Sequence, residues 1–477
     1  MSGLISYGTY IPRHRLKRSE IGAALGTGEA KGSRSVAGYD EDTTSMGVEA
    51  ARTALRRAGG SAVPERLLFA TANPPYLDKT NANVVHAALR LPSGSLAADV
   101  CGSVRSAAAA MLMAAESQPT TLVVVSDVRT GLPGGADERD GGDAAAAFVF
   151  GDGPDPIAEV LAEASTTDEF LDRWRLPGAV ASRVWEERFG EHVYLPLAEA
   201  ALTEMLKKAG LSPSELDILV VAGLHGRAVR AFGASAGAAR VADDLASSIG
   251  NCGSAQAGVT LASVLDTAQP GQTIGVVTLA DGAIAMLLRT TDTLLERRSG
   301  LTVAGQIAQG DDSLRYTDFL SWRGFLTKEP PRRPDPQGPA APPTRRSSRY
   351  KYGFVANRCE ECATMHLPAV RVCVNCKAVD RMVEVPMADK AATIATFTVD
   401  HLAYSPSPPV IAAVIDFDGG GRLSCELTDA DPAKVAIGDR VEMSFRRITT
   451  ASGIHNYFWK AKPVSAGQVT STNKTEV

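Results

Sequence analysis

The sequence has little that would place the protein at a membrane or on nucleic acid. No stretch approaches the roughly 18 consecutive apolar residues of a membrane-spanning helix. The opening MSGLISYGTY has no basic segment followed by a short apolar run, the pattern of a secretory signal. The net charge of −5 over 477 residues lacks the basic excess that nucleic-acid binding requires. We therefore expect a cytoplasmic protein that binds neither membranes nor nucleic acid.

Cysteine is also scarce, and its spacing argues against a disulfide framework. Four of the seven cysteines form two CxxC pairs, Cys359 with Cys362 and Cys373 with Cys376. Ten residues separate the pairs, a spacing typical of a tetrahedral thiolate site for zinc. Four protein ligands leave no open coordination position, so we expect structural zinc, with an unmetallated or redox use as the alternative. Cys425 is expected to be an ordinary core thiol.

The chain contains an internal repeat. LRRAG from Leu55 recurs as LKKAG from Leu206, 151 residues later, and the tripeptide CGS recurs at the same offset, from Cys101 and from Cys252. Apolar runs follow in matching order, which predicts helix, strand, helix, strand and strand in each half. We expect an α/β fold of two pseudo-symmetric halves, with chance similarity between Ala-rich and Val-rich segments as the alternative.

Composition divides the chain further. The segment between the halves is rich in aromatic and charged residues and is expected to shape a substrate mouth, while a later proline-rich segment reads as a linker. Beyond the zinc motif, alternating apolar and polar residues predict a small barrel of about five strands. The predicted divisions are a first half over 1–150, an insertion over 151–195, a second half over 196–327, a linker over 328–348, a zinc ribbon over 349–382, and a barrel with tail over 383–477.

These features resemble two known families. The duplicated halves, the opening YGTYIPRHRL and the order of the motifs are similar to hydroxymethylglutaryl-CoA synthase and ketoacyl synthase III of the thiolase superfamily, from Met1 to about Leu326. The ribbon and barrel, opened by RYKYG, resemble the DUF35 family of zinc-ribbon and OB-fold proteins, from about Arg349 to Val464. The resemblance implies a duplicated thiolase-like fold with a zinc ribbon and an OB-like barrel. It also implies a coenzyme A thioester as substrate and a homodimer formed through a sheet edge.

The resemblance also assigns candidate catalytic residues. In the thiolase-like families a His and an Asn polarise a thioester carbonyl, and these positions are matched by His225 in VVAGLHGRAV and Asn251 in SSIGNCGSAQAG. Both side chains are neutral donors that can stabilise the oxygen of an enolate or alkoxide. The resemblance therefore implies that His225 and Asn251 act on the substrate oxygen.

The nucleophile of these families is missing at its expected position. Counting from Asp99, the family pattern of an Asp followed five residues later by Cys falls on Val104. Cys101 and Ser103 lie nearby as candidates, although Cys101 and its repeat mate Cys252 are more simply read as small packing residues. The family also uses a Glu as acid and base. The corresponding stretch, TANPPYLDKTN, offers only Asp78 as a carboxylate.

Three functions fit this pattern. The first is aldol or retro-aldol chemistry on a CoA thioester without an acyl-Cys intermediate, with His225, Asp78, His192 or Tyr194 as candidate base. The second is a condensing enzyme or acyltransferase that uses Cys101 or Ser103. The third is a non-catalytic scaffold subunit that binds acyl-CoA.

Overall fold

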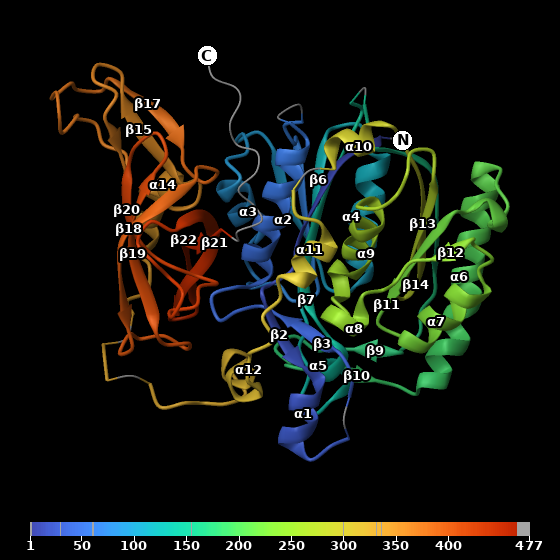
Figure 1. Ribbon diagram of the computed structural model, residues 1–477. Coiled ribbons are helices and arrows are strands. Elements are labelled where there is room, and N and C mark those ends of the chain that lie inside the picture. The colour runs from blue at the N-terminus through green and yellow to red at the C-terminus, as the bar shows by residue number, and fades with distance from the viewer. Residues whose placement is uncertain are drawn as a thin grey trace. The chain divides into compact units, whose positions relative to one another are not determined.

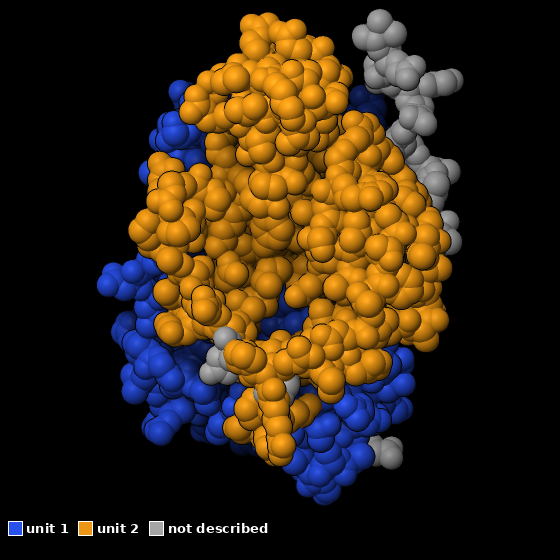
Figure 2. All heavy atoms as spheres, turned by 90° about the vertical axis from the view of Figure 1, so that its left-hand side faces the viewer, with its two compact units in different colours: residues 1–86, 91–326 blue, residues 87–90, 327–477 orange. Residues whose placement is uncertain are grey.

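The protein is described from a computed structural model that covers residues 2–28, 30–59, 62–153, 155–298, 300–330, 332–334 and 336–464 (Figure 1). The predicted tail, 465–477, lies outside these residues. The chain divides into two compact units, residues 1–86 with 91–326 and residues 87–90 with 327–477, drawn in blue and orange in Figure 2. Each unit is described by itself below.

The first unit contains the two repeated halves. The first half consists of β1 (Gly3–Tyr10), α2 (Thr43–Arg57), β4 (Arg66–Thr71), β5 (Leu96–Cys101), α4 (Arg105–Glu116), β6 (Thr121–Val128) and β7 (Asp143–Gly151). The second half consists of β8 (Ala158–Thr167), α6 (Glu187–Ala209), β11 (Ile218–Gly223), β12 (Arg240–Val241), α9 (Gln256–Leu265), β13 (Thr273–Leu279) and β14 (Gly282–Thr290). The strands join in the order β12-β11-β13-β14-β8-β1-β7-β6-β4-β5, which is symmetric about the β8 and β1 junction. This symmetry confirms the predicted duplicated thiolase-like fold.

Helices α4 and α9 lie between the two halves (Figure 1). Helix α4 contacts β4 and β6 of its own half and β14 of the other, and α9 contacts β11 as well as β1 and β7. Their small residues permit this close approach. A Cβ on Gly258 of α9 would come within 3.0 Å of the side chains of Ala146, Phe148 and Val125. Helix α2 covers β1, β6 and β7 on the outside of the first half, and α6 covers β8 and β14 on the outside of the second.

The predicted insertion over 151–195 is wrong in part. Residues 158–167 form β8 of the central sheet, and residues from 187 onward begin α6. The sequence AEVLAEASTT alternates buried and more exposed positions, the period of a half-buried strand, and its polar residues obscured the match with β1. Only residues 168–186 stand outside the repeat. They carry the short hairpin of β9 (Arg173–Trp174) and β10 (Arg183–Val184).

Smaller elements complete the first unit. They are β2 (His14–Lys17), α1 (Arg18–Leu25), β3 (Ser33–Val36), α3 (Ala82–Ala88, which runs into the second unit), α5 (Ala136–Asp140), η1 (Pro213–Glu215), α7 (Gly226–Ser235), α8 (Ala246–Ile249), η2 (Gly253–Ala255), α10 (Thr293–Arg297), α11 (Val303–Ala308) and α12 (Tyr316–Trp322). None of the described helices is both long and apolar enough to span a membrane.

A buried ionic cluster connects β7, β3 and the segment after α12. Asp143, at the start of β7, is fully buried, and its carboxylate accepts hydrogen bonds from Arg34 of β3 at 3.4 Å and from Arg323, which follows α12. The same carboxylate accepts from the backbone N–H of Ala37 at 2.7 Å and of Arg129 at 2.9 Å. The two guanidinium groups and two N–H groups offset the cost of burying this charge.

The second unit holds two antiparallel sheets. Its elements are α13 (Ala341–Arg346), α14 (Ser348–Lys351), β15 (Val355–Cys359), β16 (Met365–His366), β17 (Met382–Pro386), β18 (Ala392–Asp400), β19 (Val410–Phe417), β20 (Arg422–Glu426), β21 (Arg440–Ala451) and β22 (Ile454–Pro463). The ribbon sheet has the order β16-β15-β17, and the barrel sheet has the order β20-β19-β18-β21-β22. A bridge from Leu427 to Ala461 brings the ends of the barrel sheet together, around the buried rings of Phe354, Phe445 and Trp459. The ribbon and five-stranded barrel confirm the predicted fold class.

The predicted proline-rich linker, 328–348, contains a short helix. Helix α13 forms within it, at APPTRR, because proline is tolerated in the first turn of a helix, where backbone N–H groups have no intrahelical partner.

Candidate functional site

A cavity of about 840 Å³ opens in the first unit. It is lined by the loop after β4, the turn between β5 and α4, the β9–β10 hairpin, and the turn between β13 and β14. Both repeated halves therefore contribute to it. Ligands of α/β proteins commonly bind outside the carboxyl ends of the strands, where the loops after β4, β5 and β13 lie.

Two candidate nucleophiles line this cavity. Desolvation, with a smaller contribution from the charge of Asp99, raises the pKa of the Cys101 thiol to about 11, so the thiol is protonated at neutral pH. Ser103 also lines the cavity, and its hydroxyl has no side-chain hydrogen bond within the described part of the chain. Among the described residues, therefore, no base is hydrogen-bonded to the Ser103 hydroxyl. Cys252, the repeat mate of Cys101, is fully buried, as expected of a packing residue.

Val104 occupies the start of α4. It is the N-cap residue of this 12-residue helix, is only 6% exposed, and lines the cavity. A thiol at this position would benefit from the partial positive charge of the helix N-terminus. Valine has no group that can be acylated, so the position that the resemblance assigns to the family nucleophile cannot form an acyl-enzyme.

His225 follows β11 and caps α7, while Asn251 follows α8 and is bonded to the last residue of β11, and the backbone engages polar atoms of both side chains. The Nδ1 atom of His225 accepts from the N–H of Ala228 at 3.1 Å, which places the ring proton on Nε2, 2.9 Å from the carbonyl of Glu187. Asn251 donates from Nδ2 to the carbonyl of Gly223 at 2.8 Å. Neither residue belongs to the cavity lining, although Leu224, which precedes His225 between β11 and α7, does.

The remaining candidates differ in their placement. Asp78 and His192 are exposed and lie outside the cavity lining. Tyr194 is buried on α6 and does line the cavity, and burial, with the charges of Asp172 and Asp281, raises the pKa of its hydroxyl. Tyr194 therefore stays protonated at neutral pH and can donate a hydrogen bond.

Asp172 is a cavity residue that the sequence did not single out. It is 5% exposed, lines the cavity just before β9, and its pKa is raised mainly by burial. It stands in DEFLDRWRLPG beside Asp168 and Glu169, and nothing in that stretch distinguishes one carboxylate from another. Asp172 lines the cavity because of the path that the backbone takes into the β9–β10 hairpin, which the sequence pattern does not reveal.

Four arginines line the cavity together with Asp172 and Asp281, and three of the arginines are in ion pairs. Arg173 pairs with Asp137 at 2.6 Å, Arg129 with Asp127 at 3.6 Å, and Arg323 with Asp143. Arg175 donates to the hydroxyl of Thr130 at 3.2 Å and to the carbonyl of Ala72. Arg173 and Arg175 also tie the β9–β10 hairpin to the rest of the unit.

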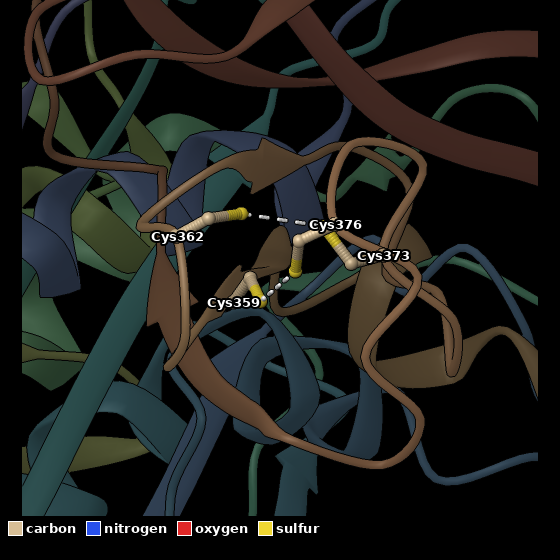
Figure 3. A group of neighbouring side chains, drawn as sticks. All are labelled: Cys359, Cys362, Cys373 and Cys376. Atoms are coloured by element: carbon tan, nitrogen blue, oxygen red, sulfur yellow. Dashed lines mark hydrogen bonds between the residues drawn. The ribbon is translucent and has the colours of Figure 1, made fainter.

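The four CxxC cysteines form a second site, in the zinc-ribbon region (Figure 3). Their sulfur atoms all lie within 4.8 Å of one another, with Cys359 to Cys376 and Cys362 to Cys373 at 3.5 Å. Sulfurs bound tetrahedrally to zinc at about 2.3 Å would lie roughly 3.8 Å apart, so the donor set and spacing fit zinc.

The two halves of this cysteine site share one backbone geometry. The residue after the second cysteine of each pair, Ala363 and Lys377, has positive φ, and its N–H bonds to the carbonyl of the first cysteine. Positive φ is unfavourable for residues other than glycine, and here it turns both knuckles toward a common centre.

Comparison with known proteins identifies the chain's relatives. A family model described as the C-terminal OB-fold domain of ChsH2 matches residues 384–446. Hydroxymethylglutaryl-CoA synthase from Methanothermobacter thermautotrophicus is 30% identical over 347 residues, which cover 69% of this chain and 99% of the relative. The chain belongs to the hydroxymethylglutaryl-CoA synthase family. A second synthase, from Aeropyrum pernix, is 31% identical over 62% of this chain and 87% of its own length.

Solved structures place the family member in the thiolase-like fold. MvaS in complex with 3-hydroxy-3-methylglutaryl coenzyme A superposes with a TM-score of 0.57 at 19% identity, covering 67% of this chain and 91% of MvaS. FabH from Pseudomonas aeruginosa PAO1 superposes with a TM-score of 0.54 at 20% identity, covering 61% of this chain and 98% of FabH. This member of the synthase family therefore carries thiolase-like halves, a ribbon and an OB-fold barrel in one chain.

Proposed function

We propose that the protein makes or breaks a C–C bond next to the carbonyl of a CoA thioester, by aldol or retro-aldol chemistry without an acyl-enzyme. The observation that carries this proposal is Val104 at the start of α4, beside a Cys101 thiol whose pKa is raised to about 11. The names of the synthase relatives, and the solved structures bound to CoA compounds, support CoA thioesters as the substrate class.

The chemistry requires donors for an enolate or alkoxide oxygen. The Tyr194 hydroxyl is one, since it lines the cavity as a neutral group. We propose His225 and Asn251 as further donors. His225 would reach the substrate once its Nε2–H leaves the carbonyl of Glu187, and Asn251 once its Nδ2 group leaves the carbonyl of Gly223. Catalytic hydrogen bonds are often formed only in the substrate complex.

A second candidate function is acyl transfer through Cys101 or Ser103. It is favoured by one observation, which is that both side chains line the cavity. In this mechanism the thiolate or alkoxide displaces CoA from the thioester and is left acylated.

Acylation separates the two candidates. We expect no acyl adduct on the wild-type protein after incubation with acetyl-CoA, acetoacetyl-CoA and other acyl-CoAs, as measured by intact mass and peptide mapping. Val104→Cys should become acylated at residue 104, because its thiol would sit at the N-terminus of α4. Val104→Cys combined with Cys101→Ala should keep that adduct.

A wild-type adduct on Cys101 or Ser103 would instead establish acyl transfer. The aldol proposal is tested directly by chromatography of the same mixtures, which should detect products in which a C–C bond has formed or broken. Acyl-CoA binding with neither adduct nor product would leave only the role of a scaffold subunit.

We propose further that the four-cysteine group holds structural zinc and that the protein is a homodimer. Strand β5 is an edge strand with half-exposed residues, so a second copy can extend the sheet there. Sedimentation velocity should give the mass of two 50.0 kDa chains, and Leu96→Lys, at an exposed position of this edge, should shift it toward one. A monomeric wild-type protein would contradict the dimer.

A further inference from the structure

The carboxyl group of Asp172 is buried without a hydrogen-bond partner. The residue is 5% exposed, and neither carboxyl oxygen accepts a hydrogen bond or joins an ion pair within the described part of the chain. Its backbone carbonyl, in contrast, accepts from Trp185 at 2.7 Å. Buried polar groups are nearly always paired, so an unpaired carboxyl that lines a cavity calls for an explanation.

A glycine brings this carboxyl close to His225. A Cβ on Gly190 of α6 would lie 2.5 Å from Oδ1 of Asp172, and 2.6 Å and 2.7 Å from Cδ2 and Nε2 of the His225 ring. Both side chains therefore occupy the space that any other residue at position 190 would fill. The ring of Tyr194 lies 5.8 Å from the ring of His225, centroid to centroid.

Of these three groups, only the carboxyl is free to take a proton. The Nδ1 atom of His225 already accepts from a backbone N–H and Nε2 carries the ring proton, while the Tyr194 hydroxyl is protonated. Asp281 also lines the cavity, but it is exposed.

We propose that Asp172 is the general base of this cavity, an assignment that rests on the function proposed above. Its carboxylate takes a proton from the carbon next to the thioester carbonyl. The electron pair of the broken C–H bond moves onto the carbonyl oxygen as an enolate. The enolate carbon then bonds to the carbonyl carbon of a second substrate, and the proton held by Asp172 passes to the new alkoxide. The retro-aldol direction runs through the same steps in reverse.

The surroundings of the carboxyl suit this role. Burial raises the pKa of Asp172 more than His225 and Arg173 lower it, and Asp281 raises it further. A carboxylate with a raised pKa is a stronger base than an ordinary Asp.

Proton exchange at carbon tests the assignment without a second substrate. Acetyl-CoA and propionyl-CoA, incubated with the full-length protein in D₂O, should gain deuterium next to the carbonyl, as followed by mass spectrometry. Asp172→Asn should slow this exchange by about 10²- to 10⁴-fold, the usual worth of positioned proton transfer. Asp168→Asn, an exposed neighbour in the same segment, should change it less than about twofold.

The pH profile adds a signature that a structural role would not produce. The wild-type exchange rate should rise with pH through the raised pKa of Asp172, as the carboxyl ionises, and the residual rate of Asp172→Asn should lack that step. Asp172→Glu keeps a carboxylate, so it should exchange faster than Asp172→Asn, with thermal unfolding of each variant confirming that it is folded.

The outcomes separate the two proposals. Undiminished exchange by a folded Asp172→Asn overturns the assignment of the base and leaves the proposed function standing. A wild-type protein that binds acyl-CoA but neither exchanges protons nor changes C–C bonds overturns both.

Discussion

Asp143→Ala is expected to destabilise the thiolase-like unit by about 3 to 5 kcal/mol, measured as the free energy of unfolding in urea. The carboxylate it removes is fully buried between Arg34 and Arg323, and the side chain of Arg34 is fully buried as well. The change would leave both guanidinium groups, and the N–H of Ala37, without this partner in the interior. Leaving buried charges uncompensated is among the most damaging effects of a single substitution.

Asp140→Ala is the matched control. Asp140 lies three residues earlier and is 46% exposed; it pairs with the equally exposed Arg139 at 2.6 Å and, more loosely, with Arg18 at 3.8 Å. An ion pair in solvent is worth about 0 to 1 kcal/mol, so this change should have little effect. Equal losses for the two variants would show that burial of the Asp143 cluster does not govern stability.

Removal of zinc is expected to unfold the ribbon of the second unit. The purified protein should contain one zinc per chain, and a strong chelator should lower the unfolding temperature of the ribbon. Structural zinc binding is worth roughly 10 to 16 kcal/mol at neutral pH in small zinc domains. In this protein the metal would also stabilise the unfavourable positive-φ turns that follow each cysteine pair, at Ala363 and Lys377. Cys373→Ser should reproduce the loss without chelator.

Cys425→Ala provides the control within the same unit. Cys425 lies on β20, outside the four-cysteine group, so this variant should retain one zinc per chain. A wild-type protein that lacks zinc and unfolds at the same temperature with and without chelator would contradict a structural metal.

Patterns that local chemistry dictates were predictable from the sequence. The CxxC spacing predicted the cysteine cluster because metal ligation constrains residue type and separation together. The repeat predicted the order of helices and strands because each half must bury the same faces. Strand β8 was not predicted, because its alternate positions are polar and its similarity to β1 was therefore not recognised.

The arrangement of the site was less predictable, because its side chains are positioned by backbone groups that are distant in the sequence. The ring of His225 is fixed by a carbonyl of α6, 38 residues earlier, and no local pattern encodes that contact. Asp172 differs from Asp168 only in facing the cavity and the glycine at position 190. Residues 168–186 lie within the second half, between β8 and α6, but outside the repeated elements, so the repeat could not assign them.

The β9–β10 hairpin gives the cavity a weakly anchored wall. Its two strands share only two residue pairs, and side chains of Arg173 and Arg175 make its ties to neighbouring segments. Segments with few backbone bonds open at a small fraction of the free energy of global unfolding. We therefore expect this hairpin to open locally before the ten-stranded sheet unfolds. Asp172 lies at the base of this hairpin. Opening of the hairpin would therefore also move the Asp172 carboxylate, so that the position of the proposed base would depend on whether the hairpin is open or closed.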